Sequence, residues 1–138
     1  MALLANGCGE EGASSGATVS VYVVAPLCTG AKRELARAGE LAGELRVRAL
    51  CLADPRRRAG VSLAAIGVNA RGAVEDSTAV AYLEAPGPST RFSRPIVEAA
   101  GIAVVNSGSG EAAMARVLRA IANADRGSPR DAVRERLD

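Results

Sequence analysis

Short β-branched apolar runs alternate along this chain with longer segments in which apolar residues recur every three or four positions. The short runs predict strands over residues 18–25, 46–53, 78–83 and 102–105. The first is typical of a buried strand, whereas the second alternates before it becomes apolar, which suits a strand nearer the sheet edge. The longer segments predict amphipathic helices over residues 31–45, 61–75, 89–100 and 111–124. Pro95 lies inside the third of these, so we expect that helix to begin late or to kink. Ser128, Pro129 and Asp131 form a capping box that opens a short terminal helix.

This order of elements predicts an α/β fold. Right-handed βαβ crossovers give a three-layer domain, with four parallel strands in the order 2-1-3-4, numbered along the chain, and helices on both faces of the sheet. We expect helix 111–124 to pack on the sheet through one apolar stripe, formed by Met114, Val117, Leu118 and Ile121.

Ligands of such sheets bind beyond the carboxyl ends of the strands, where this chain has loops 26–30, 54–58, 84–90 and 106–110. Ser89 and Thr90 stand at a predicted helix start. They suit either a helix cap or an anion site that uses the free N–H groups, and spacing alone favours the cap.

Composition excludes several classes of chemistry. The 138 residues suit one domain, and the chain has no histidine, which rules out Ser-His-Asp and Cys-His catalysis and histidine-bearing zinc sites. Cys8, Cys28 and Cys51 lie far apart without a C-x-x-C motif, so we expect no metal site and no cofactor. The net charge is +2, and acidic and basic residues are interspersed along most of the chain, which argues against a nucleic-acid partner. We interpret the arginine run at 56–58 as solvated loop charge.

The first residues form a separate segment. Residues 1–8 resemble the end of a bacterial lipoprotein signal, with Cys8 as the lipidated residue, although Ala5 and Asn6 depart from the usual pattern. Residues 9–17 have the composition of a tether, so we predict a disordered tail over 1–17 and a domain over 18–138. The alternative is a tail with an incidental cysteine. The first interpretation predicts an extracytoplasmic, lipid-anchored protein, and the second a cytoplasmic one.

Three stretches, at 19–30, 69–82 and 89–102, resemble landmarks of the type I periplasmic solute-binding proteins that deliver leucine, isoleucine and valine to ABC transporters. The most specific is NARGAVEDSTAVAY at 69–82, which is similar to the helix end that leads into the family's third strand. Residues 110–121 and 130–137 resemble the family's final helices, so the second lobe is missing between about 107 and 110. The resemblance implies a single lobe of this fold.

The resemblance also implies a function. It predicts a solute-binding component of an ABC transporter, not an enzyme, with an ABC permease as partner. Its ligand contacts fall on or near Gly87, Ser89, Thr90, Asn106, Ser107 and Gly108. Positions 87 and 110 have glycine where family members carry a hydroxyl, and half of the cleft is absent, so we expect weak or no binding of an aliphatic amino acid.

Two other classes of function stay open. The lobe could act as an interaction module that forms a homodimer through its exposed apolar face. An enzyme that uses Cys28 or Asp54 at the strand ends is the weakest reading, because the sequence places no base beside Cys28.

Overall fold

The computed structural model describes residues 17–124 and 128–137. The strands are β1 (Thr18–Val24), β2 (Leu41–Ala42), β3 (Leu45–Leu52), β4 (Arg56–Arg57), β5 (Gly60–Val61), β6 (Ala79–Glu84) and β7 (Ala103–Asn106). The helices are α1 (Cys28–Arg37), α2 (Leu63–Val74), α3 (Thr90–Ala99), α4 (Gly110–Ala122) and α5 (Pro129–Leu137). None of the helices within these ranges is long and apolar enough to cross a membrane.

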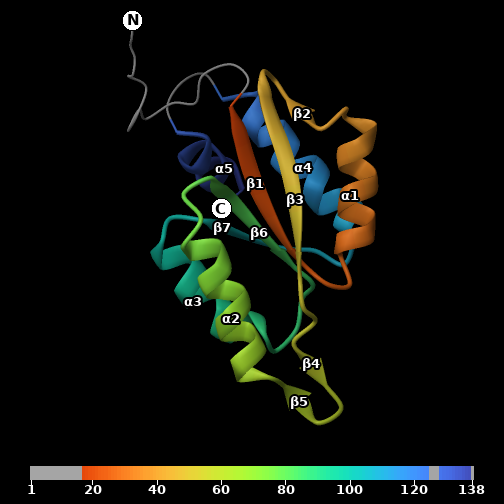
Figure 1. Ribbon diagram of the computed structural model, residues 1–138, viewed down its shortest axis with the longest axis vertical. Helices are drawn as coiled ribbons and strands as arrows, with labels where there is room; N and C mark the ends of the chain where they lie inside the picture. The colour runs from red at the N-terminus through yellow and green to blue at the C-terminus, as the bar shows by residue number, and fades with distance from the viewer. Residues whose placement is uncertain (1–16, 125–127, 138) are drawn as a thin grey trace, which may run out of the picture.

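The main sheet has five strands in the order β2-β3-β1-β6-β7 (Figure 1). β3, β1, β6 and β7 pair in parallel, whereas β2 pairs antiparallel with β3 at the edge. The predicted α/β class with a mostly parallel sheet is therefore confirmed. The four predicted strands keep their predicted relative order, since 2-1-3-4 corresponds to β3-β1-β6-β7. The prediction of a four-stranded, all-parallel sheet is wrong, because the antiparallel strand β2 lies beyond β3 at the edge.

The extra strand arises where a longer helix was predicted over residues 31–45. Helix α1 ends at Arg37, because Gly39 and Glu40 take left-handed backbone conformations with φ of 69° and 61°. Two such residues in succession cannot continue a right-handed helix. The chain therefore reverses, and Leu41 and Ala42 pair with Arg46 and Leu45 of β3.

Helices cover the sheet in two layers (Figure 1). On one face α1, α4 and α5 pack against the sheet around a core that includes Val21, Met114 and Val133. On the other face α2 and α3 enclose a smaller core around Tyr82 and Val97. The predicted stripe of α4 is fully used, since Met114, Val117, Leu118 and Ile121 are all buried.

Pro95 neither delays nor ends α3, which begins at Thr90 and continues to Ala99. The predicted capping box opens α5, where the Ser128 hydroxyl accepts a hydrogen bond from the Arg130 backbone N–H at 3.1 Å. The Arg130 guanidinium then donates to the carbonyls of Ala79 at 2.8 Å and Ala100 at 3.1 Å. This side chain fixes α5 to the amino edge of β6.

The predicted tail and its lipidation residue Cys8 lie outside the described residues, except for Ala17 at the end of the tail. The Ala17 carbonyl accepts a hydrogen bond from the Arg46 N–H at 2.8 Å, so the chain is held to the sheet immediately before β1.

Candidate functional site

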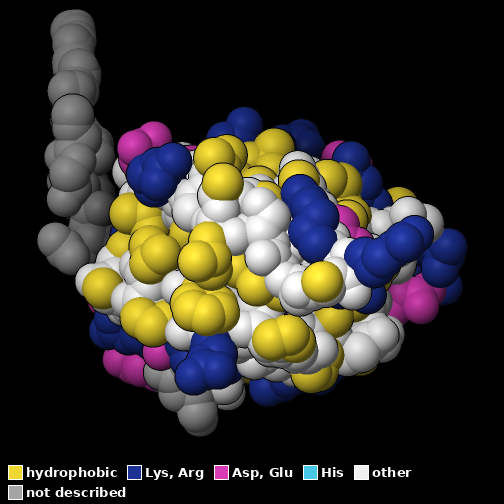
Figure 2. All heavy atoms as spheres, turned by 90° about the horizontal axis from the view of Figure 1, so that it is seen from below, with side chains coloured by type: hydrophobic (Ala, Val, Ile, Leu, Met, Phe, Trp, Pro, Cys, Tyr) yellow, Lys and Arg dark blue, Asp and Glu magenta, His cyan; other side chains and the backbone are white. Residues whose placement is uncertain are grey.

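The carboxyl ends of the parallel strands meet at one edge of the sheet, as the paired residues Glu84 and Asn106 show for β6 and β7. A cavity of about 80 Å³ opens at this edge. It is lined by three short segments that follow β1, β3 and β6, namely residues 24–26, 54–56 and 84–89. Figure 2 views the molecule from this edge, where hydrophobic side chains cover much of the surface and Lys and Arg side chains lie mostly towards its periphery.

The central feature of this edge is the carboxylate of Glu84, the last residue of β6, which is only 2% exposed. Three hydroxyls from the start of α3 donate to it: Ser89 to Oε2 at 2.9 Å, and Thr90 and Ser93 to Oε1 at 3.2 and 2.6 Å. Within the described residues, no Lys or Arg forms an ion pair with Glu84. The negative charge is therefore buried on hydroxyl groups alone.

This arrangement changes the role expected of Ser89 and Thr90. Ser89 is the residue before α3, but its side chain makes no capping hydrogen bond and is used on Glu84 instead. The backbone N–H groups of Thr90, Phe92 and Ser93 already bond to the Gly87 and Ser89 carbonyls. The helix start that was expected to receive a ligand carboxylate thus lies against the protein's own carboxylate.

Two other predicted site residues, Asn106 and Ser107, contact Glu84. Asn106 donates through Nδ2 to the Glu84 carbonyl and to Thr90 Oγ1, both at 3.1 Å, and accepts from Arg94 at 2.8 Å. The Ser107 N–H also donates to the Glu84 carbonyl, at 3.2 Å. The predicted loops 86–90 and 106–110 are therefore joined through Glu84 and Asn106.

Two glycines of these loops differ in the space around them. Gly108 is exposed, and a Cβ added there would meet no atom within 4 Å. A Cβ on Gly110 would meet the Leu27 carbonyl oxygen and would lie 2.8 Å from the Ala31 nitrogen. The start of α4 packs directly on the start of α1, so this position has no room for a hydroxyl side chain.

The arginine run at 56–58 belongs to a β4–β5 hairpin, which projects beyond the carboxyl edge (Figure 1). The Arg56 guanidinium makes a forked contact with Asp54, with Nη2 at 2.6 Å from Oδ2 and Nε at 2.9 Å from Oδ1. These hydrogen bonds hold the pKa of the Asp54 carboxyl below its ordinary value. Arg56 is therefore a partner of Asp54 at the rim of the cavity.

Cys28 and Cys51 form a disulfide between the start of α1 and β3, which the sequence interpretation missed. Cys28 lies shortly after β1 and Cys51 lies in β3, the strand that pairs with β1, so their positions near the carboxyl ends of adjacent strands were the available signal. A disulfide-bonded Cys28 is not a free nucleophile, which removes one basis for the enzyme hypothesis.

Within the described residues, no group of three or more acidic, cysteine or histidine side chains could hold a metal ion. Comparison with protein-family models, with curated proteins and with solved structures gives no match to this chain.

Proposed function

We propose that this chain is a single solute-binding lobe of the type I periplasmic kind, which binds an aliphatic amino acid weakly at the carboxyl edge of its sheet. The observation that carries the proposal is the cavity formed by the ends of β1, β3 and β6, because open α/β sheets bind ligands at this edge. Much of its lining is apolar, including Val24, Ala85 and four prolines, which suits a small aliphatic side chain.

The charge of the cavity favours the ammonium group of the ligand. Its lining contains two carboxylates, Asp54 and Glu84, and one cation, Arg56, which Asp54 already pairs. The negative charge of Glu84 also contributes, after burial, to a raised pKa of the neighbouring Tyr82 phenol. A ligand carboxylate placed here would be repelled, whereas an ammonium group would be attracted.

The affinity should be low, because the cavity is small and one-sided. Its volume of about 80 Å³ compares with about 300 Å³ or more for sites that enclose a small ligand. Millimolar binding corresponds to only about 4 kcal/mol.

The test is an NMR titration of the full chain with leucine, isoleucine and valine, and with two fragments of leucine. Isoamylamine keeps the ammonium group and isocaproate keeps the carboxylate. We expect leucine and isoamylamine to shift resonances of residues 84–90 at millimolar concentration, and isocaproate to have no effect. Micromolar binding by a monomer would contradict the one-sided site, and equal binding of isocaproate would contradict the orientation.

Glu84→Gln provides a variant that removes the charge and nearly keeps the shape. We expect it to abolish the response to isoamylamine. Glu75→Gln is the control, since Glu75 is exposed and follows α2 away from the cavity lining. Changes confined to other loops in the native protein would refute the location of the site.

The disulfide supports an extracytoplasmic location and hence a role beside an ABC permease, because structural disulfides persist mainly in oxidising compartments. Alkylation of thiols in intact cells of the source organism tests this. We expect Cys51 to be protected until a reductant is added, and a freely alkylated Cys51 would contradict the location.

Self-association is a second candidate function, supported by the outer surfaces of α2 and α3. Leu63, Val68, Phe92 and Ile96 on these two helices are between 40% and 61% exposed. Exposed apolar side chains on packed helices are typical of contact surfaces. Analytical ultracentrifugation should then show a dimer that Ile96→Glu dissociates and that Leu41→Glu, at the exposed edge strand, leaves intact. A monomer at all concentrations would exclude this function.

A further inference from the structure

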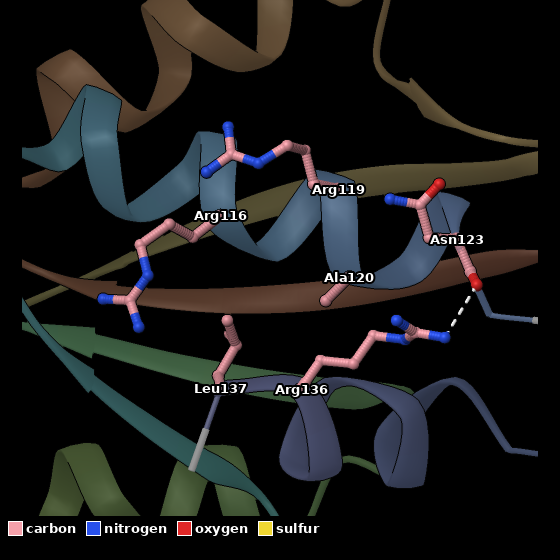
Figure 3. Close-up of a pocket in the computed structure, with 6 residues that line it drawn as sticks. All are labelled: Arg116, Arg119, Ala120, Asn123, Arg136 and Leu137. Atoms are coloured by element: carbon pink, nitrogen blue, oxygen red, sulfur yellow. Dashed lines mark hydrogen bonds between the residues drawn. The ribbon is translucent and has the colours of Figure 1, made fainter.

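A second hollow, of about 290 Å³, lies between α4 and α5, away from the carboxyl edge. Figure 3 shows its lining side chains: four come from α4 and the residue that follows it, and two from the end of α5. They are Arg116, Arg119, Ala120, Asn123, Arg136 and Leu137. The four α4 positions share one stripe, because they follow each other at intervals of three, one and three residues.

Positive charge distinguishes this hollow. Its lining contains three arginines and no acidic residue. In the part of the chain that the structure describes, none of the three forms an ion pair. Arg136 uses one N–H group on the Asn123 carbonyl, at 2.9 Å, and each guanidinium has five N–H groups in all.

Most other arginines on the same helical layer are neutralised within the fold. Arg33 and Arg37 both contact Glu111 at the start of α4, and Arg134 pairs with Asp131. Among the described residues of α1, α4 and α5, these arginines have acidic partners, whereas the three arginines at the hollow between α4 and α5 have none.

We propose that this hollow, named here the α4–α5 groove, binds an anion of the phosphate class with at least two negative charges. Planar guanidinium groups bind phosphate oxygens through two parallel hydrogen bonds. Arg116, Arg119 and Arg136 leave different sides of the small apolar floor of Ala120 and Leu137, with their guanidinium groups pointing apart (Figure 3). Rotation of these long side chains towards the floor would bring more than one guanidinium to a single anion. The volume is close to that of small-ligand sites. This site is independent of the amino-acid site proposed above.

The phosphate groups could come from a soluble compound or from the headgroup of an anionic lipid. Two probes separate these sources: inorganic pyrophosphate in solution, and vesicles that contain phosphatidylglycerol. Binding of pyrophosphate identifies a soluble ligand, and binding of vesicles alone identifies a headgroup.

The experiment is calorimetric titration of the full chain with pyrophosphate at low ionic strength, and sedimentation with the vesicles. We expect Arg119→Gln to weaken binding about tenfold, since a charge-assisted hydrogen bond of ordinary strength corresponds to at least that factor. The exposed side chain of Arg119 makes no hydrogen bond to described residues, so we expect this variant to keep the fold. The double variant Arg116→Gln/Arg136→Gln should remove the remaining response.

Arg57→Gln/Arg58→Gln is the matched control, because it removes two exposed positive charges from the β4–β5 hairpin. We expect it to change the affinity less than twofold. Equal weakening by the control would show general charge attraction and would overturn the proposal. An absence of binding to both probes at low ionic strength would also overturn it.

Discussion

The Cys28–Cys51 disulfide should contribute about 3 kcal/mol to the stability of the fold. It closes a loop with a sequence separation of 23 residues, which contains α1, β2 and most of β3. The loss of chain entropy in the unfolded state grows with the logarithm of the loop length, and a loop of this size gives about 11 cal/mol/K. At 298 K this corresponds to about 3 kcal/mol of free energy of unfolding.

Urea unfolding of the same chain before and after reduction measures this contribution directly. With a denaturant dependence of about 1.5 kcal/mol/M, reduction should lower the midpoint by about 2 M. The double variant Cys28→Ala/Cys51→Ala separates the cross-link from packing, because Cys28 is buried in the core and Cys51 is exposed. We expect it to unfold at or slightly below the midpoint of the reduced protein.

Two results would refute this reasoning. Coincident unfolding curves for the oxidised and reduced chains would show that the cross-link does not restrict the unfolded state. Three reactive thiols in the denatured, unreduced protein would show that no disulfide exists, since all three cysteines of the chain would then be free.

Three further predictions concern the packing and electrostatics of the fold. Gly110→Ala should lower the free energy of unfolding by about 3 kcal/mol, because its Cβ would overlap the backbone at the start of α1. Gly108→Ala is the control and should change the free energy of unfolding by less than about 0.5 kcal/mol, so similar urea midpoints for the two variants would contradict the close contact. Burial alone would raise the pKa of Asp76, but hydrogen bonds from Thr78 and Tyr22 outweigh this, so the pKa is lowered from 3.8. The ionised Asp76 carboxyl therefore stabilises the fold fully above pH 3.8, and this stabilisation is lost as the pH falls through the lowered pKa. Asp76→Asn should lower the free energy of unfolding by about 1 kcal/mol at pH 7. A stability difference between this variant and the native protein that does not shrink in acid would refute the lowered pKa. Arg130→Ala should cost about 2 kcal/mol in thermal unfolding, and the exposed Arg134→Ala much less; equal losses would show that the bonds to the β6 and α3 carbonyls are not important.

The sequence predicts the layers of the fold well, because the parallel strands coincide with β-branched apolar runs and the apolar stripe of α4 is strongly periodic. It fails at residues 38–45. There, alanines and leucines at helical spacing concealed a reversal that depends on the left-handed backbone at Gly39 and Glu40. Local backbone conformation of this kind is not visible in a hydrophobic pattern, and the edge strand β2 was missed for the same reason.

For the candidate site, the sequence predicted that two loops would adjoin, but not the chemistry that joins them, and residues 106–110 do not line the cavity. Strand ends indicated that loops 86–90 and 106–110 would adjoin, and hydrogen bonds join them in the structure. The partner of Ser89 and Thr90 was unforeseen, because a pattern of donors does not say which acceptor they meet. The available signal was Glu84, an acidic residue that ends an otherwise apolar buried strand.

The position of α5 has a consequence for the order in which the chain can fold. Val133 of this last helix is fully buried against the sheet, and Arg130 binds carbonyls on both β6 and the residue after α3. The β6–β7 half of the sheet therefore lacks part of its cover on one face until α5 has been synthesised and has packed. A nascent chain can form β1, β3 and α1 earlier, but its core is complete only after α5 has emerged from the ribosome. During synthesis the protein therefore exposes apolar surface, which is the state that chaperones and export machinery bind.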